Sequence, residues 1–344
     1  SVAQSSATRD NGLVPSRVPE RTPPLFARRL AALAIALAAT GCGRAPVAAP
    51  IQAAQPVAAA TKSLHAFTSD AAGFDTHSFW YDTGREVIVF DAQFTPALAQ
   101  QLIAGIRAAT RSPITTLVIT HPNPDKFNGA TAFQAIGAQV VASRATAAAM
   151  PGVHAYKKAY FVDVAKLFTA ATYPALPKVD RTFESTCELA GGAVRLSVLR
   201  HAGVASTQTV AAIPAARALV VGDLVHHQAH AWLEGGIVAG KPRLDVDAWL
   251  AALDELKAFP GTTAYGGRGE AAPVARAVAD EQAYLRRVRE IARAYAQALP
   301  AGELAGRHAA AHQAEVAKRI AAAFPSYTLP YLTGYSVYGL LAAI

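Results

Sequence analysis

The sequence predicts an α+β fold, an αββα sandwich in which two packed mixed β-sheets carry helices on their outer faces. Two observations lead to this prediction. Strand-like and helix-like segments alternate from 78 to 142. Four strand-like segments then follow one another from 186 to 221 with short turns, which is typical of an antiparallel sheet. A chain of 344 residues, 52% of them hydrophobic, is long enough to bury the core that this sandwich needs.

The elements of the first half have clear patterns. Residues 78–90 predict two strands joined by a turn at Gly84. Residues 95–109 predict a helix, because Leu98 and Leu102 recur on one face. The remaining elements are a buried strand at 114–119, a short helix at 130–136 and a strand at 138–142.

A helical insertion, expected at 150–182, separates this half from the strand-rich second half. The insertion contains Tyr156, Lys157 and Phe161. It suits either a basic, aromatic lid for an anionic substrate or, as we prefer, an amphipathic helix with lysines facing outward. The second half is expected to contain strands at 186–189, 193–199, 207–213, 218–221 and 262–265, and helices at 246–259 and 272–299.

The start of the chain predicts an export signal. Arg28 and Arg29 precede a short apolar stretch, and the end of that stretch, Ala39-Thr40-Gly41-Cys42, resembles the lipobox of bacterial lipoproteins. We expect an exported bacterial protein, in the periplasm or anchored to a membrane only through a lipid on Cys42. A plain signal peptide and a buried apolar helix are the alternatives. The expected order is a signal peptide at 1–41, an Ala/Pro-rich tether at 42–62, a main domain at 63–300, and a C-terminal helix with a strapping segment at 301–344.

The charge pattern excludes nucleic acid as the expected partner. The formal net charge is +8, but the chain has no dense run of lysine and arginine and no basic stripe interleaved with aromatic residues. A small-molecule substrate is the partner that we expect instead.

Four expected strands are each followed by unusual polar residues. A lone His in such a place is more often structural, and a lone Gly-Asp pair is more often a turn. Side chains at strand ends can converge, so the four together predict one polar site. The four segments are His121 to Lys126 after 114–119, His201 after 193–199, Asp223 after 218–221, and Gly267-Arg268-Gly269 after 262–265.

The order of these segments resembles that of the metallo-β-lactamase superfamily over about residues 64–295. The family motif T-H-x-H-x-D-H-x-x-G aligns with THPNPDKFNG at 120–129. The resemblance implies the same two-sheet fold, a hydrolase activity and a zinc site. It also implies that the metal-ligand positions include His121, Asn123, His201 and Asp223.

Three ligand positions depart from the family pattern. Asn123 stands where the first metal has its middle His, and an amide oxygen is a weak ligand for zinc. Lys126 and Arg268 stand at two His positions of the second metal, and neither binds a metal while protonated. We therefore expect at most one divalent metal ion, with zinc as the first choice, held by His121, His201 and Asp223 together with Asn123 or water.

Two functions are compatible with this pattern. The first is a one-metal hydrolase of a small ester, lactone, amide or phosphate outside the cytoplasm, with Asp125 as the catalytic residue that handles the attacking water. The second is a metal-free binding lipoprotein, in which Lys126 and Arg268 pair with Asp125 and Asp223 and also grip an anionic ligand. β-Lactam hydrolysis is not expected, because in the family it relies on ligands that this chain lacks.

Three histidines follow Asp223. His230 begins the segment HAWL, which is similar to a His-x-[WY]-Leu segment that lines the pocket in some branches of the family. We expect His230 to contact the substrate, whereas His226 and His227 are expected only to line a loop.

Overall fold

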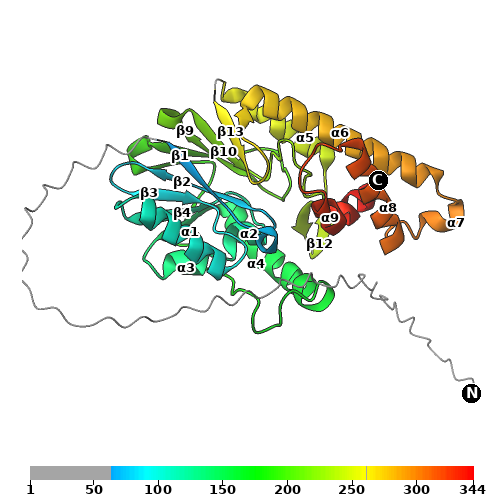
Figure 1. Ribbon diagram of the computed structural model, residues 1–344, viewed down its shortest axis with the longest axis horizontal. Helices are drawn as coiled ribbons and strands as arrows, with labels where there is room; N and C mark the ends of the chain where they lie inside the picture. The colour runs from blue at the N-terminus through cyan, green and yellow to red at the C-terminus, as the bar shows by residue number, and fades with distance from the viewer. Residues whose placement is uncertain (1–62, 261) are drawn as a thin grey trace, which may run out of the picture. The chain divides into compact units, whose positions relative to one another are not determined.

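The computed structural model describes residues 63–260 and 262–344 of the chain. Two six-stranded sheets pack against each other and helices cover their outer faces, which confirms the predicted αββα architecture (Figure 1). The expected signal peptide, Cys42 and the tether lie outside the described residues. Within the described ranges, no helix is both long and apolar enough to cross a membrane.

The strands of the first sheet pair in chain order: β1 (Leu64–Thr68), β2 (His77–Asp82), β3 (Val87–Phe90), β4 (Ile114–Ile119), β5 (Gln139–Ser143) and β6 (Arg181–Phe183). The first three strands pair antiparallel, and β3 to β6 pair in parallel. Parallel neighbours need a crossover connection, and the helices of this half of the chain supply it. The carboxyl ends of β3, β4 and β5 therefore share one edge of the sheet.

The second sheet is mainly antiparallel and contains β7 (Thr186–Leu189), β8 (Val194–Val198), β9 (Thr209–Ile213), β10 (Ala218–Gly222), β13 (Thr263–Gly266) and β14 (Ala272–Pro273). Its order is β14-β13-β10-β9-β8-β7. Only β10 and β13 pair in parallel, so their carboxyl ends lie side by side. A separate hairpin consists of β11 (Gly236–Val238) and β12 (Lys241–Arg243).

The helices cover both sheets. Those in the first half are α1 (Pro96–Ala109), α2 (Pro124–Phe127), α3 (Ala130–Gln134) and α4 (Arg144–Ala159), and those in the second half are α5 (Val246–Glu255), α6 (Val274–Ala298), α7 (Ala301–Leu304), α8 (Ala310–Ala323) and α9 (Tyr331–Ala342). Thr95 caps α1, since its hydroxyl accepts the Leu98 amide proton. In Figure 1, α1 and α3 lie on the outer side of the first sheet, and α5 and α6 lie over the second.

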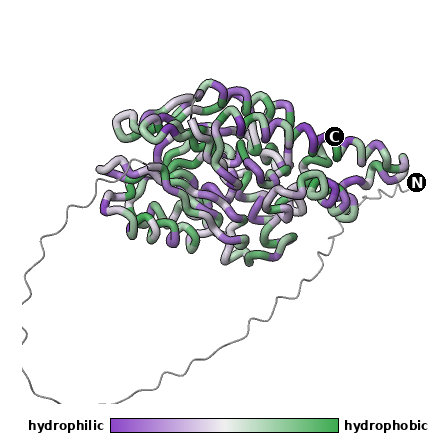
Figure 2. Tube along the Cα trace, turned by 45° about the horizontal axis from the view of Figure 1, so that its top comes forward, coloured by the Kyte–Doolittle hydropathy of each residue, from purple (hydrophilic) through white to green (hydrophobic). Residues whose placement is uncertain are grey.

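Alternation along the strands divides the core into layers. In β3, Ile88 and Phe90 pack between the two sheets, whereas Val87 and Val89 face the covering helices. In β10, Val220 faces the other sheet and Val221 faces the helices. Figure 2 shows the matching alternation of hydrophilic and hydrophobic residues along the helices. Side chains from both sheets thus form one shared buried layer between them.

Two segments differ from the expectation. The insertion begins earlier than 150, with α4 at Arg144, and Lys157 is buried instead of facing outward. The C-terminal segment, expected to hold a helix and a strap, packs on the body through α8 and α9, and the strap is helical even though it contains Gly334 and Gly339. The apolar side chains of α9 that enter the core are Leu332, Val337, Leu340 and Leu341.

Candidate functional site

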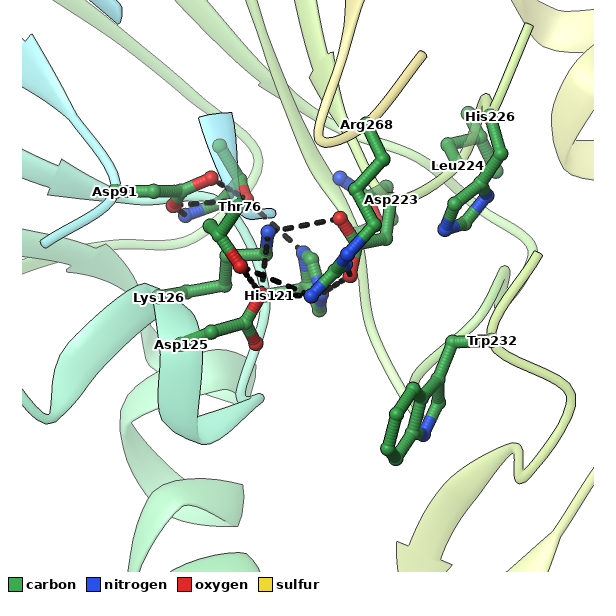
Figure 3. A network of polar contacts seen from close by, with 12 residues as sticks. Thr76, Asp91, His121, Asp125, Lys126, Asp223, Leu224, His226, Trp232 and Arg268 are labelled. Atoms are coloured by element: carbon green, nitrogen blue, oxygen red, sulfur yellow. Dashed lines mark hydrogen bonds and ion pairs between the residues drawn. The ribbon is translucent and has the colours of Figure 1, made fainter. Parts of the chain in front are cut away.

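Most of the polar residues predicted to share a site do converge (Figure 3). His121 follows β4, and Asp223 follows β10. Arg268 follows β13, the parallel neighbour of β10, so it lies next to Asp223. Asp125 and Lys126 reach the same place from the short helix α2. The strand ends therefore assemble this site, as the sequence predicts.

The two acidic and two basic residues form a closed set of contacts, which we call the ion network (Asp125, Lys126, Asp223 and Arg268). Lys126 Nζ lies 2.8 Å from Asp125 Oδ2 and 2.7 Å from Asp223 Oδ1. Arg268 Nη1 lies 2.8 Å from Asp223 Oδ2, and Nη2 lies 3.0 Å from Asp125 Oδ2. Each of the four residues is buried. The prediction that both cations pair with both carboxylates is confirmed.

The connection between β1 and β2 holds Arg268 in place. Its Nε donates to the Phe74 carbonyl oxygen at 2.8 Å, and its Nη2 donates to Thr76 Oγ1 at 2.9 Å. A Cβ at Gly267 would lie 1.8 Å from Asp223 Oδ1, so only glycine fits beside the network. Arg268 is thus fixed by the β1–β2 connection as well as by the two carboxylates.

Charge pairing outweighs burial at both carboxylates. Burial opposes ionisation of Asp125, but the charges of Lys126 and Arg268 together lower its pKa. The same balance holds the pKa of Asp223 well below its usual range. Burial would lower the pKa of Lys126, yet the two carboxylates raise it. All four groups of the ion network are therefore charged at neutral pH, and their charges sum to zero.

His121 lies beside the ion network without joining it closely. Its Nε2 is 3.7 Å from Asp223 Oδ2. Its Nδ1 lies 3.0 Å from Thr120 Oγ1, and that hydroxyl donates to Asp91 Oδ2 at 2.8 Å. Burial raises the pKa of Asp91 to about 6, against the opposing charge of Lys126. This chain of contacts fixes the His121 ring from behind.

The donor set does not fit the expected divalent metal ion, zinc included. Among residues 63–260 and 262–344, no group of three or more His, Cys, Asp or Glu side chains is placed to hold a metal. Lys126 Nζ lies between Asp125 and Asp223, where a bridging cation would have to be. Of the imidazoles expected as ligands, only His121 is present here, and Asn123 adds only an amide.

The structure corrects the expected role of His201. Its side chain is 47% exposed, and its Nδ1 lies 2.7 Å from Glu255 Oε1 at the end of α5. The backbone amides of Arg200 and His201 donate to the same carboxylate at 3.0 Å each. These three bonds turn the loop after β8 away from the ion network, so His201 does not join it.

His230 also lies elsewhere than expected. It is buried, and its Nδ1 lies 3.2 Å from the Tyr284 hydroxyl within an aromatic cluster that includes Phe324 and Tyr327. Burial lowers the pKa of His230 to about 4, so the ring is neutral. It packs the C-terminal segment instead of lining the pocket. His227 contacts Asp280 of α6, in agreement with a structural role.

A small pocket of about 20 Å³, room for about one water molecule, lies against the ion network. Its aromatic walls come from four separate segments of the chain, and its polar end contains members of the ion network. The lining residues are Phe74, Phe94, Asn123, Pro124, Asp125, Lys157, Phe161, Asp223, Trp232 and Arg268. The sequence predicts Asn123, Asp125, Asp223 and Arg268 in this site.

A second buried ion pair borders the pocket and is not predicted from the sequence. Lys157 of α4 pairs with Glu234, which also accepts from Trp232 Nε1 at 3.0 Å and from the Tyr338 hydroxyl of α9. Lys157 Nζ lies 4.9 Å from the centre of the Trp232 ring. Lys157 and Tyr338 each lie at least 77 residues from Glu234 along the chain. Partners this distant leave no local sequence pattern that would reveal them.

An αββα sandwich with a polar site at the ends of its strands defines the class of this protein. Residues 71–268, more than half of the chain, match the model of the metallo-beta-lactamase superfamily. The chain therefore belongs to the metallo-beta-lactamase superfamily. No curated protein matches it.

Solved structures with similarity to the chain were also found. A metallo-beta-lactamase from Pontibacter korlensis is 21% identical, with a TM-score of 0.48, and the match covers 65% of this chain and 94% of that chain. TMB-1 is 14% identical, with a TM-score of 0.48, over 65% of this chain and 98% of that chain. The DIM-1 metallo-beta-lactamase is 16% identical, with a TM-score of 0.48, over 65% and 92%.

Proposed function

We propose that this protein is a metal-independent, small-molecule-binding member of its superfamily. One observation carries the proposal: Lys126 Nζ lies 2.8 Å from Asp125 and 2.7 Å from Asp223. An ammonium group in this position supplies the positive charge that a bridging metal would supply. The carboxylates are thereby compensated without a metal.

A one-metal hydrolase has weaker support. A catalytic zinc site keeps three protein ligands and one open position for water. His121 and Asp223 remain together here, but His201 faces Glu255 and leaves the set short of a ligand. Asp125, the expected catalytic residue, is committed to Lys126 and Arg268. These contacts favour binding over metal-assisted hydrolysis.

The pairing also changes the role that we propose for the two cations. Lys126 and Arg268 each contact both Asp125 and Asp223, so their charge is already balanced. They hold the end of the pocket in shape and do not grip an anionic ligand.

Metal content tests the proposal directly. Residues 62–344 are to be purified after growth with added zinc, manganese or iron, and bound metal is then measured by elemental analysis. We expect far less than one metal ion per chain. A Lys126→His/Arg268→His double variant returns two imidazoles beside Asp125 and Asp223 and should bind more metal than the parent. A stoichiometric metal in the parent that is lost in His121→Ala would refute metal independence.

We further propose that the protein is an exported bacterial lipoprotein anchored through Cys42. The support is the sequence alone, in which basic residues, a short apolar stretch and a lipobox-like segment occur in the expected order. Expression of the full chain in a bacterial host should place it in the membrane fraction. Cys42→Ser should move it out of that fraction, with Cys187→Ser as the matched control. A Cys42→Ser protein that stays in the membrane fraction would contradict the anchor.

A further inference from the structure

The pocket against the ion network has room for about one water molecule, so a small-molecule ligand needs another site. A second cavity, of about 350 Å³, is lined by residues from β12, α6, the end of α9 and the start of α5 (Figure 1). Its volume lies in the range of ordinary small-molecule sites. We call it the arginine groove, because Arg243, Arg289 and Arg293 line it.

Two of the three arginines in the groove have no counter-ion. Arg289 Nη1 lies 2.6 Å from Asp247 Oδ1, and this pair holds the Arg289 side chain against the protein. Arg293 lies one turn further along α6, on the same side of that helix. Among residues 63–260 and 262–344, neither Arg293 nor Arg243 of β12 has an ion-pair partner or a hydrogen-bond acceptor for its side chain. Two guanidinium groups are therefore available to an anion that enters the groove.

The two acidic residues of the groove do not cancel this charge. The hydrogen bond from Arg289 and the charge of Arg293 both lower the pKa of Asp247, so this carboxylate is ionised and already engaged. Asp245 Oδ1 accepts the Ala248 amide proton at 2.8 Å and thereby caps α5. Three arginines against two aspartates leave one positive charge in excess.

The bottom of the arginine groove is apolar. Leu244, Val246 and Leu340 line it and are buried members of one core cluster. Because core packing fixes these side chains, they offer a preformed apolar surface to a ligand body. At the end of the groove, the main-chain oxygen of Ile344 accepts a hydrogen bond from Arg307 Nη2 at 3.4 Å, so it has its own cationic neighbour outside the groove.

We infer that the arginine groove binds a small organic anion, with its carboxylate or phosphate group at Arg243 and Arg293 and a short apolar body over Leu244 and Val246. Guanidinium groups donate paired hydrogen bonds to either kind of oxyanion. The inference rests on the proposed function, since it supplies the ligand site of a metal-independent binding protein. The excess positive charge sets the charge of the ligand, and the buried apolar side chains set its body.

A matched series of four compounds tests each part of the inference by calorimetric titration of the full chain. The series is phenyl phosphate, phenylacetate, 2-phenylacetamide and inorganic phosphate. At least one of the two organic anions is expected to bind, and the better of them shows which oxyanion the groove prefers. The amide lacks only the charge of phenylacetate, and inorganic phosphate lacks the apolar body, so each should bind about ten-fold or more weakly than the better organic anion. Equal or tighter binding of the amide or of inorganic phosphate would overturn the inference.

Two variants locate the bound anion. Arg243→Gln and Arg293→Gln each remove one guanidinium group and should weaken binding of the better organic anion about five-fold or more. Both side chains are exposed, so the variants should fold like the parent. Arg287→Gln is the matched control on α6, because Arg287 is 57% exposed and pairs with Glu290 outside the groove, and it should leave the affinity unchanged.

The outcome is separable from that of the proposed function. A metal-free protein that binds neither organic anion, or whose affinity is unchanged in both Arg243→Gln and Arg293→Gln, overturns the arginine groove as the ligand site and leaves metal independence standing. A stoichiometric metal in the parent overturns the proposed function, whatever the compounds do.

Discussion

At the scale of single residues, Lys126 is the most informative position. A lysine is almost never fully buried unless it is paired. Lys126 is fully buried, and it has two carboxylates within 2.8 Å. Its charge therefore belongs to the internal structure of the pocket and depends on both partners.

Replacing this lysine should destabilise the fold. Lys126→Met leaves Asp125 and Asp223 with Arg268 alone, and removing one partner from a buried ion pair costs about 3–5 kcal/mol. Urea denaturation measures the loss. Lys178→Met is the control, because that side chain is 82% exposed and its loss should cost at most about 0.5 kcal/mol. Equal stability of the two variants would contradict the structural role of Lys126.

Asp91 should make stability fall as the pH rises. Its pKa is raised to about 6 by burial, above its unfolded value of about 3.9, so the folded chain holds a proton that the unfolded chain releases. The contribution of Asp91 to the free energy of unfolding is fully present below pH 4. It falls by about 3 kcal/mol as the pH rises through 6. Asp125 and Asp223 act in the opposite direction, so the measured quantity is the difference between wild type and Asp91→Asn. A difference that stays constant between pH 4 and pH 7 would refute this effect.

Which site residues the sequence predicts correctly depends on whether their positions are determined by a strand or by a distant contact. His121, Asp223 and Arg268 directly follow strands that the sequence defines well, so their convergence follows from the fold. His201 follows a strand too, but its orientation depends on a contact with Glu255, 54 residues away. A partner this distant leaves no local pattern, and the expected ligand set is incomplete for that reason.

At the scale of elements, α9 packs directly against Glu234, the residue that pairs with Lys157. A Cβ at Gly339 would lie 2.1 Å from the Glu234 carbonyl oxygen, so the helix backbone lies directly against the residue that pairs with Lys157. Regular strands such as β4 and β10 are visible in the sequence because they are runs of apolar and β-branched residues. The short strands β1, β6, β11 and β12 lack such runs and are not predicted.

Two glycines of α9 should respond in opposite ways to the same substitution. Gly339→Ala must push α9 away from Glu234 and should cost about 1–3 kcal/mol. Gly334→Ala meets nothing within 4 Å and should stabilise the helix by about 0.5–1 kcal/mol. Thermal and urea unfolding of both variants measure the difference. A neutral Gly339→Ala would mean that α9 does not lie against Glu234.

At the scale of the whole molecule, the residues beyond the family match complete the core. The match ends at 268, yet side chains of α8 and α9, such as Val316, Ile320 and Leu340, lie in the same buried cluster as Trp249. Membership of the superfamily can be predicted from the order of the motifs. The contribution of the last two helices to the core cannot, because their packing partners are distant in the sequence.

A chain that ends at residue 300 should lose cooperative folding. Its end would expose the face of α6 that packs on α8 and would remove the Tyr338 hydroxyl from Glu234. Limited proteolysis and near-ultraviolet circular dichroism, with the full chain as the control, measure the effect. Protease resistance equal to that of the full chain would contradict it.

The ion network also limits which single substitutions at positions 126 and 268 the protein can tolerate during evolution. Returning one histidine at 126 removes a cation from between two buried carboxylates, and the chain must fold with excess negative charge before any metal arrives. Returning one at 268 does the same and also releases the bonds to Phe74 and Thr76. Each single substitution to histidine thus gives a less stable protein, so both cations would have to be replaced together before a metal could take their place.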